Sequence, residues 1–174
     1  MTTHRRMPHT RYPRNLEDAY RRRIVKLVYQ WRKVAMDYFN VYMRDYFNGG
    51  TQIVADAPKN NPTETEQQNV LRNLDVMGYT IKQATSDATI RSIAEQFVRT
   101  IDMFSYNNVA MQIRIAGINP IRNSPELTKM FNARVAENVQ LIKYMKDRYA
   151  DGITGVISRA ISNGDGTGAI TKEI

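Results

Sequence analysis

Apolar residues recur at helical spacing throughout the first quarter of the chain. After Asn15, which with Asp18 three positions on offers an N-cap, neither glycine nor proline occurs until Gly49. The pattern predicts one long amphipathic helix over residues 15–48, ending near Phe47 and roughly 50 Å in length. Such a helix is longer than a compact domain of this size is wide, so we expect an elongated molecule.

The predicted helix carries apolar side chains on more than one side. Its main stripe on a helical wheel consists of Leu16, Tyr20, Ile24, Leu27, Val28, Trp31, Ala35, Tyr38, Phe39, Tyr42 and Tyr46. A second apolar line consists of Tyr29, Met36, Met43 and Phe47. Because a helix that is apolar on both sides is usually buried on both, we expect it to pack on its own chain and on another subunit.

The middle of the chain predicts a hinge followed by helices. Residues 49–62 are rich in glycine, proline and asparagine and predict a loop. Residues 63–117 show helical periodicity, with a new helix start at Ser86 or Asp87. The string from Gly117 to Pro120 predicts the end of this region.

The last part of the chain, residues 124–174, predicts a C-terminal helical module. Ser124 is an N-cap residue followed by Pro125 at the first helical position. We expect a break near residues 147–152, then a short helix, a glycine-rich turn from Asn163 to Gly168, and one more helix. Since no segment alternates with period two, the predicted fold class is all-α.

Composition restricts the chemistry that the chain can perform. With 174 residues and 42% hydrophobic content it can bury a core, and it has no apolar run or leader typical of a transmembrane helix or signal peptide. The absence of cysteine excludes disulfides, thiolate zinc sites and cysteine nucleophiles. The only histidines are His4 and His9, where a packed active site is not expected. We therefore expect neither an enzyme nor a cofactor.

The net charge of +8 is concentrated at the N-terminus. Residues 1–33 hold ten basic and two acidic side chains, whereas the remaining 141 residues hold fifteen of each sign. Residues 1–14 are almost free of apolar side chains and predict an extended basic arm that becomes ordered on a partner. The excess charge indicates a polyanionic partner, which could be nucleic acid, an acidic protein surface or a membrane face.

The arginine cluster at residues 21–23, with Tyr20 and Tyr29 nearby, has three interpretations. Such a cluster grips phosphates, matches acidic side chains on a protein, or forms a solvated face. No nucleic-acid recognition motif accompanies it, so sequence-specific readout is not expected. The candidate partner-binding residues are Arg5, Arg6, Arg11, Tyr12, Pro13, Arg14, Tyr20, Arg21, Arg22, Arg23, Lys26 and Trp31.

The segment from Asn163 to Ile174 has part of the spacing of an EF-hand calcium loop. Its twelfth position, where calcium needs a bidentate glutamate, is Ile174, and Glu173 stands one place early. Asp165 is the single carboxylate at a liganding position. We therefore expect a turn between two helices and no metal site.

Two stretches near the ends of the chain resemble a known family. Near the C-terminus, Asn138-Val-Gln-Leu-Ile-Lys143 is followed by a helix, a glycine turn and Ile170-Thr-Lys-Glu-Ile174. Near the N-terminus stands Arg11-Tyr-Pro-Arg-Asn-Leu-Glu-Asp-Ala-Tyr20. In this order they resemble the head morphogenesis proteins of tailed phages, the Mu-type protein F minor head proteins and their siphophage relatives. The residues that carry the C-terminal motif are Asn138, Leu141, Ile142, Lys143, Gly164 and Ile170.

The resemblance implies a structural virion protein. Family members are minor capsid proteins that dock at the portal vertex inside the phage head and assist head assembly. The implied partners are the portal protein, the major capsid protein and packaged double-stranded DNA, with no membrane and several copies per virion. The family pattern continues beyond the last helix, so we expect the module at residues 124–174 to be incomplete. The alternative, based on charge alone, is a non-specific nucleic-acid-binding or condensing protein.

Overall fold

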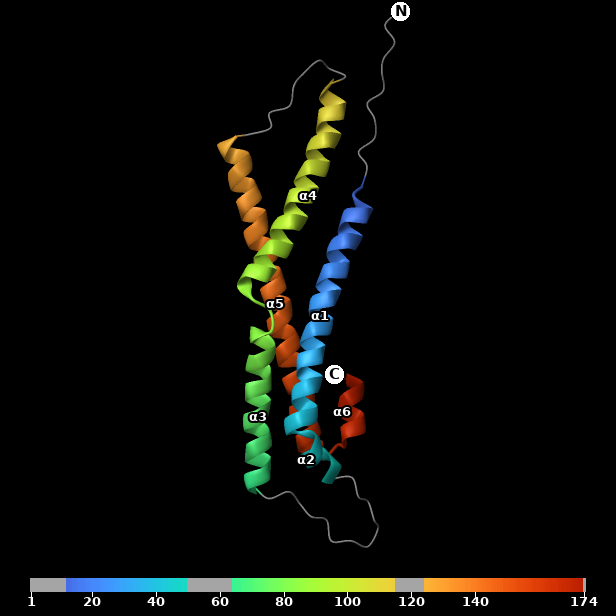
Figure 1. Cartoon of the computed structure of the whole chain (residues 1–174), viewed down its shortest axis with the longest axis vertical. Coiled ribbons are helices and arrows are strands. Elements are labelled where there is room, and N and C mark those ends of the chain that lie inside the picture. The colour runs from blue at the N-terminus through green and yellow to red at the C-terminus, as the bar shows by residue number, and fades with distance from the viewer. Residues whose placement is uncertain (1–11, 50–63, 115–123, 174) are drawn as a thin grey trace, which may run out of the picture. The chain divides into compact units, whose positions relative to one another are not determined.

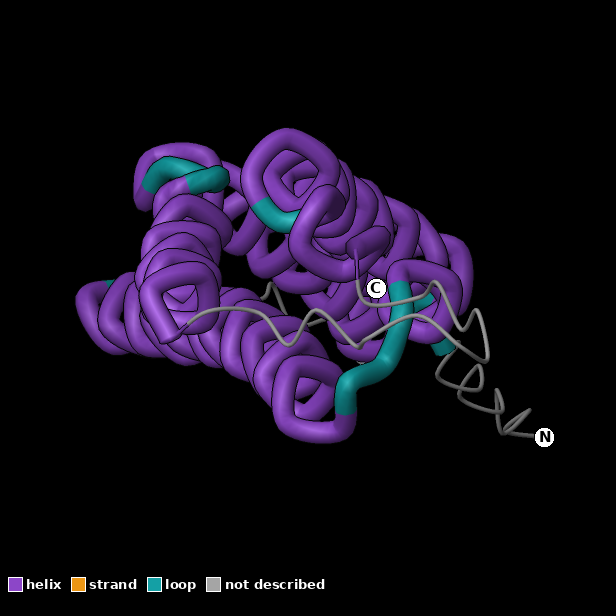
Figure 2. Tube along the Cα trace, turned by 90° about the horizontal axis from the view of Figure 1, so that it is seen from below, coloured by secondary structure: helices purple, strands orange, loops and turns teal. Residues whose placement is uncertain are grey.

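The computed structural model describes residues 12–49, 64–114 and 124–173. Within these ranges every regular element is an α-helix, as the colouring in Figure 2 shows. The all-α fold class predicted from the sequence is therefore confirmed for the described residues. The helices, labelled in Figure 1, are α1 (Arg14–Tyr42), α2 (Arg44–Gly49), α3 (Glu64–Gln83), α4 (Asp87–Arg114), α5 (Pro125–Asn163) and α6 (Thr167–Glu173).

The internal contacts divide the chain into two compact units. The first unit comprises Met1–Val25 and Asp87–Ile142, and the second comprises Lys26–Ser86 and Lys143–Ile174. Helices α1 and α5 each contribute their N-terminal part to the first unit and their C-terminal part to the second. Each unit thus combines parts of several of the segments expected from the sequence. Most of the expected hinge at 49–62 lies outside the described residues.

In the first unit, α4 supplies most of the core. One face of α4 and one face of the N-terminal part of α5 carry its buried apolar side chains, which are Ile90, Ala94, Val98, Ala110, Val135 and Ile142. The intervals of four from Ile90 to Val98 and of seven from Val135 to Ile142 are those of amphipathic helices packed along one stripe. Arg134 Nη1 and Asp102 Oδ1 form an ion pair at 2.9 Å between α5 and α4. Helix α4 begins at Asp87, as predicted, whereas the expected stop at residues 117–120 lies outside the described ranges.

In the second unit, α1 supplies the largest buried side chains. Leu27, Trp31, Ala35 and Phe39 are buried at intervals of four residues, which confirms the centre of the predicted main stripe. The turn at Met43 and the other helices of this unit contribute the remaining buried apolar side chains, which are Met43, Phe47, Val70, Leu74, Met77, Ile81, Ala150, Ile153, Ile157, Ala160 and Ile170.

The long N-terminal helix is shorter than predicted because it breaks at Met43. Helix α1 ends at Tyr42, Met43 forms a turn, and α2 follows as a separate helix. The rings of Phe39 and Phe47 have centroids 5.7 Å apart. In an uninterrupted helix, residues eight apart are separated by about 12 Å of rise, so the rings could not meet. The prediction of one helix to Phe47 was wrong because the break allows Phe47 to pack back on Phe39.

The second apolar line of α1 is covered by the chain at one end only. Met43 and Phe47 are buried, and Met36 is half-buried. Tyr29, in contrast, is 63% exposed. Within residues 12–49, 64–114 and 124–173, no segment covers the part of this line that lies around Tyr29.

The turn between α3 and α4 is held by a buried lysine. Lys146 on α5 is only 7% exposed, and its Nζ donates to the carbonyl oxygen of Thr85 at 3.5 Å. Thr85 follows the C-terminus of α3, where carbonyl groups without a helical partner favour a cation. The attraction between the Lys146 ammonium group and these carbonyl groups therefore explains why this lysine is buried.

Helix α5 begins as the sequence predicts. The N–H of Leu127 donates to Ser124 Oγ at 3.2 Å, and Pro125 is the first helical residue. The Glu126 carboxyl accepts a hydrogen bond from the backbone amide of Glu126 and a further one from the Ser124 hydroxyl. Both hydrogen bonds lower the pKa of this carboxyl. The predicted cap is confirmed.

The break predicted in α5 near residues 147–152 does not occur. The helix is continuous from Pro125 to Asn163, with Gly152 and Gly155 inside it. An interior glycine costs a helix only about 1 kcal/mol relative to alanine. The buried face formed by Ala150, Ile153, Ile157 and Ala160 outweighs that cost through tertiary packing. The break predicted from the local sequence was therefore wrong.

The C-terminus of α5 is closed by a Schellman motif. Gly164 has a φ of +70°, the left-handed conformation that glycine adopts without steric cost. Its N–H donates to the carbonyl of Ile161 at 3.4 Å, and the N–H of Asp165 donates to the carbonyl of Ala160 at 2.9 Å. The predicted turn is confirmed, and α6 follows it.

Replacing Gly164 with alanine is expected to lower the free energy of unfolding by about 1–2 kcal/mol, because a Cβ disfavours the left-handed conformation. Urea denaturation followed by circular dichroism measures this change. The matched control is Gly168→Ala in α6, where an added Cβ meets nothing within 4 Å and φ is not left-handed. An equal loss in both variants would contradict the assignment of Gly164 as the cap.

Candidate partner-binding surface

The exposed basic side chains of the N-terminal helix make up most of the candidate surface that the structure describes. Of the predicted residues, Arg5, Arg6 and Arg11 lie outside the described ranges. Along α1 the exposed ones are Arg14, Arg21, Arg22 and Lys26. None of these four pairs with a carboxylate within residues 12–49, 64–114 and 124–173. Their charge is therefore available to a partner.

Arg23 differs from its two neighbours. Its side chain is half-buried, and its Nη1 donates to Gln96 Oε1 on α4. The guanidinium therefore holds α1 to α4 within the first unit. Of the cluster at residues 21–23, only Arg21 and Arg22 face solvent.

Tyr12 and Pro13 define how the chain enters α1. The hydroxyl of exposed Tyr12 donates to Glu17 Oε2 at 2.8 Å. This hydrogen bond and the negative charge of Glu17 raise the pKa of the Tyr12 phenol. The carbonyl of Pro13 accepts from the N–H groups of Leu16 and Glu17 at 3.0 and 3.2 Å. Both residues therefore bind to the first turn of α1.

Tyr20 joins three helices of the first unit. Its ring stacks on Phe97 of α4, with centroids 4.0 Å apart and 17° between the planes. Its hydroxyl donates to Asn138 Oδ1 of α5 at 3.2 Å, and burial raises the pKa of the phenol. The structure therefore brings together Tyr20, which ends the N-terminal stretch of the family resemblance, and Asn138, which begins the C-terminal one.

Trp31 is not part of the surface. It is fully buried in the second unit, where its Nε1 donates to Thr85 Oγ1 at 2.8 Å. Its ring also lies against Tyr149, with centroids 6.0 Å apart. The sequence interpretation of Trp31 as a partner-binding residue is corrected: its aromatic area and its N–H group are used inside the chain.

The remaining residues of the C-terminal motif have structural roles or lie at the surface. Ile142 is buried in the first unit and Ile170 in the second. Lys143 is half-buried, Leu141 is exposed, and Gly164 caps α5. The motif thus specifies core and cap positions rather than a cluster of reactive groups.

The calcium-like segment folds as a cap and a helix. Asn163 Nδ2 donates to Asp165 Oδ2 at 3.5 Å, and α6 already begins at Thr167. An EF-hand loop instead wraps twelve residues around the ion. In the part of the chain that the structure describes, no group of three or more acidic or histidine side chains could hold a metal ion.

No family model, curated protein or solved structure matches this chain. Among the described residues, no helix is both long and apolar enough to cross a membrane.

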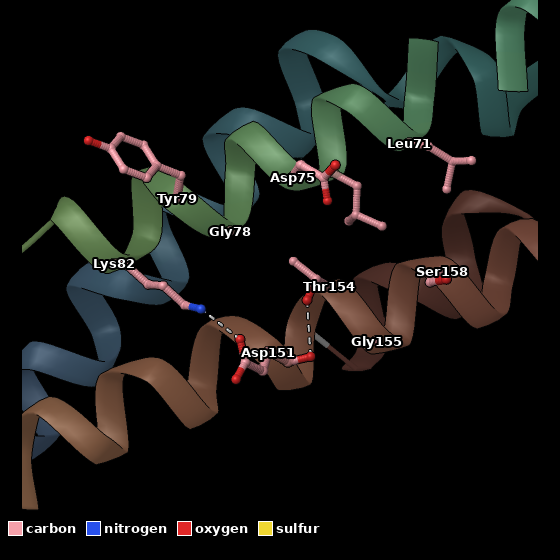
Figure 3. Close-up of a pocket in the computed structure, with 10 residues that line it drawn as sticks. Leu71, Asp75, Gly78, Tyr79, Lys82, Asp151, Thr154, Gly155 and Ser158 are labelled. Atoms are coloured by element: carbon pink, nitrogen blue, oxygen red, sulfur yellow. Dashed lines mark hydrogen bonds and ion pairs between the residues drawn. The ribbon is translucent and has the colours of Figure 1, made fainter. Parts of the chain in front are cut away.

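The sequence did not indicate a groove in the second unit, between α3 and the C-terminal part of α5. It has a volume of about 720 Å³ and is shown in Figure 3. It is lined by Leu71, Leu74, Asp75, Gly78, Tyr79, Lys82, Asp151, Thr154, Gly155 and Ser158. A Cβ on Gly78 would lie 3.1 Å from Thr154 Cγ2, so this glycine permits the close approach of the two helices. Gly78 and Gly155 are the two glycines of the groove, and the break predicted near residues 147–152 included neither of them.

Proposed function

We propose that this chain is a structural minor head protein of a tailed phage that docks at the portal vertex inside the capsid and assists head assembly. The observation that carries the proposal is the hydrogen bond between Tyr20 and Asn138, 118 positions apart in sequence. Each residue belongs to one of the two stretches that resemble the head morphogenesis family. A chance resemblance in two short stretches gives no reason for them to meet in space.

The charge distribution supports docking through the N-terminal part of the chain. Arg14, Arg21, Arg22 and Lys26 are exposed and unpaired with carboxylates among the described residues. Rim charges of this kind increase association rates and select partners of opposite charge. The portal protein is the proposed partner, with the major capsid protein and packaged double-stranded DNA as further contacts inside the head. The proposed role is structural and involves no cofactor.

The test is co-purification of the chain with the portal protein of the same phage after nuclease treatment. Deletion of residues 1–33 is not informative, because it removes buried Trp31 and the stacked Tyr20. The better variant is Arg21→Gln, Arg22→Gln and Lys26→Gln, which removes three exposed charges and leaves both aromatic residues in place. We expect portal binding to weaken about tenfold or more.

The matched control removes three exposed charges elsewhere, through Arg72→Gln, Lys129→Gln and Lys172→Gln. It has the same net charge as the α1 variant and should retain portal binding. Equal binding by the wild type and both variants would disprove docking through α1. Absence of any portal binding by the wild type would disprove the proposed function itself.

The uncompensated charges on α1 also favour a second function, non-specific binding and condensation of nucleic acid. In this case the association constant for any duplex DNA would fall log-linearly with salt, with a slope of about 0.9 for each phosphate neutralised. A portal contact that includes apolar area instead persists at about 0.5 M salt, because burial of apolar surface is not screened. Retention of the portal together with weak DNA capture at that salt would exclude the second function.

A further inference from the structure

The second unit carries an exposed ridge on α1 that none of the described residues covers. Tyr29 lies at its centre, and the exposed cations Lys26 and Arg32 lie one turn before and after it. Trp31, two residues on, is fully buried, and two residues correspond to about 200° of helical rotation. Tyr29 therefore points away from the core of the second unit, and it makes no hydrogen bond or ring contact among the described residues.

The groove between α3 and α5 has the complementary character. Leu71 and Leu74 form the apolar wall of the groove on α3. Gly155 and Ser158 have small side chains, so they project little into the groove from α5. Figure 3 shows Thr154 on α5 facing α3. An aromatic side chain from outside that lies over Gly155 would have to displace the flexible end of Arg159, whose Nη1 lies 3.6 Å from the position of an added Cβ.

The charge at the groove is also complementary to the ridge. Asp75 and Asp151 line the groove, and Lys82 Nζ is bound to Asp151 Oδ1 at 2.9 Å. The hydrogen bond to Asp151, together with the charges of Asp151 and Asp147, raises the pKa of Lys82. Arg159 adds one cation beside Gly155. Asp75 has no ion-pair partner in the described part of the chain, which leaves it for a cation from outside.

Gly155 is not required by the packing of its own chain. A Cβ at this position would meet only Arg159 Nη1, at an ordinary contact distance of 3.6 Å. Glycine inside a helix is nevertheless unfavourable by roughly 0.5–1 kcal/mol relative to alanine. The packing of the described residues therefore gives no reason for a glycine on the groove side of α5.

We propose that the groove binds the Tyr29 ridge of a second copy of this chain, with Tyr29 over Gly155 and Ser158 and with Lys26 near Asp75. The contact is head-to-tail, because one copy contributes the ridge and the other the groove. Repetition of such a contact produces a closed ring or an open filament, depending on the rotation between copies. Apart from Lys26, this contact uses residues that the portal docking proposed above does not use.

The experiment measures self-association of the full chain by sedimentation equilibrium after nuclease treatment. The groove variant is Gly155→Leu, whose side chain fills the groove and whose Cβ would lie at an ordinary contact distance from Arg159 Nη1. Its matched control is Gly152→Leu on the same helix, where the added Cβ meets nothing within 4 Å and which does not line the groove. The ridge variant is Tyr29→Asp, and its control is Tyr42→Asp at another exposed tyrosine of α1.

We expect both test variants to weaken self-association about tenfold or more, as removal of a central aromatic anchor does, and both controls to associate like the wild type. The decisive measurement is an equimolar mixture of Gly155→Leu and Tyr29→Asp. The first retains an intact ridge and the second an intact groove, so the mixture should form a one-to-one heterodimer and nothing larger.

A wild-type chain that remains monomeric up to about 0.1 mM would overturn the proposal. Undiminished association of Gly155→Leu, or a mixture that remains monomeric, would overturn it as well. Association that vanishes on nuclease treatment would assign it to bridging nucleic acid instead. Circular dichroism of each variant shows that its fold is intact, and none of these outcomes depends on whether the portal binds.

Discussion

Replacement of Trp31 by alanine should lower the free energy of unfolding by about 3–5 kcal/mol, the range typical for truncation of a fully buried large aromatic residue. The indole is 0% exposed, and its loss leaves a cavity beside Tyr149 and an unpaired Thr85 hydroxyl. This is a large part of the 5–15 kcal/mol by which a domain is usually stable. Urea denaturation followed by far-ultraviolet circular dichroism is the appropriate measurement, because Trp31 is the only tryptophan.

Two further variants separate packing from hydrogen bonding at this position. Trp31→Phe keeps most of the apolar area and should cost less than the alanine variant, mainly through a smaller ring and a lost hydrogen bond worth about 1 kcal/mol. Tyr29→Ala, at the exposed residue two positions away, should change stability by no more than about 0.5 kcal/mol. If Trp31→Ala were as stable as Tyr29→Ala, the assignment of Trp31 to the core would be refuted.

The second large effect is expected at Phe39. Its side chain is fully buried, and its ring packs against Phe47 across the break at Met43. We expect Phe39→Ala to reduce the free energy of unfolding by about 3–5 kcal/mol. It should also release α2, because the ring contact with Phe47 is lost. Hydrogen exchange of the backbone amides of residues 44–49 measures this local effect, which global denaturation does not resolve.

The control for Phe39 lies on the same helix. Val41 is 69% exposed, so Val41→Ala should leave both stability and the protection of α2 within error. Loss of protection in α2 with Val41→Ala, or full protection with Phe39→Ala, would show that α2 is held by contacts other than the Phe39–Phe47 pair. Its packing against α6, with Thr167 Oγ1 donating to Asn48 Oδ1 at 3.0 Å, is the other candidate.

The two proposals assign different surfaces of α1 to different partners. Portal docking uses the exposed charges from Arg14 to Lys26, whereas the contact between copies uses the ridge around Tyr29. Lys26 lies in both, so its substitution alone does not distinguish them. Gly155→Leu does, because the groove has no role in portal docking. Portal binding by this variant should equal that of the wild type.

Helix positions and faces were predictable where a strong local signal coincided with packing. The interval of four residues from Leu27 to Phe39 predicted the buried stripe of α1, and the structure buries these residues. Ser124 and Pro125 predicted the start of α5, and Gly164 predicted its end, because caps depend on backbone geometry within a few residues. These features need no knowledge of distant segments.

Helix continuity was less predictable because it depends on contacts between distant residues. Gly152 predicted a break in α5, yet burial of Ala150 and Ile153 keeps the helix continuous. Conversely, no breaker residue predicted the turn at Met43, which the packing of Phe47 on Phe39 requires. In both cases tertiary burial outweighed local propensities of about 1 kcal/mol or less.

The sequence by itself determined that this protein is helical, where its main helices begin, which face of α1 is buried and where its excess positive charge lies. Periodicity, capping residues and formal charge are local properties, so they can be derived without coordinates. Only the tertiary structure decided that Trp31 is in the core, that Arg23 is held by Gln96, that Tyr20 meets Asn138, and that α3 and α5 form a groove. These features depend on which residues meet across large sequence separations, and that is set by the packing of the whole chain.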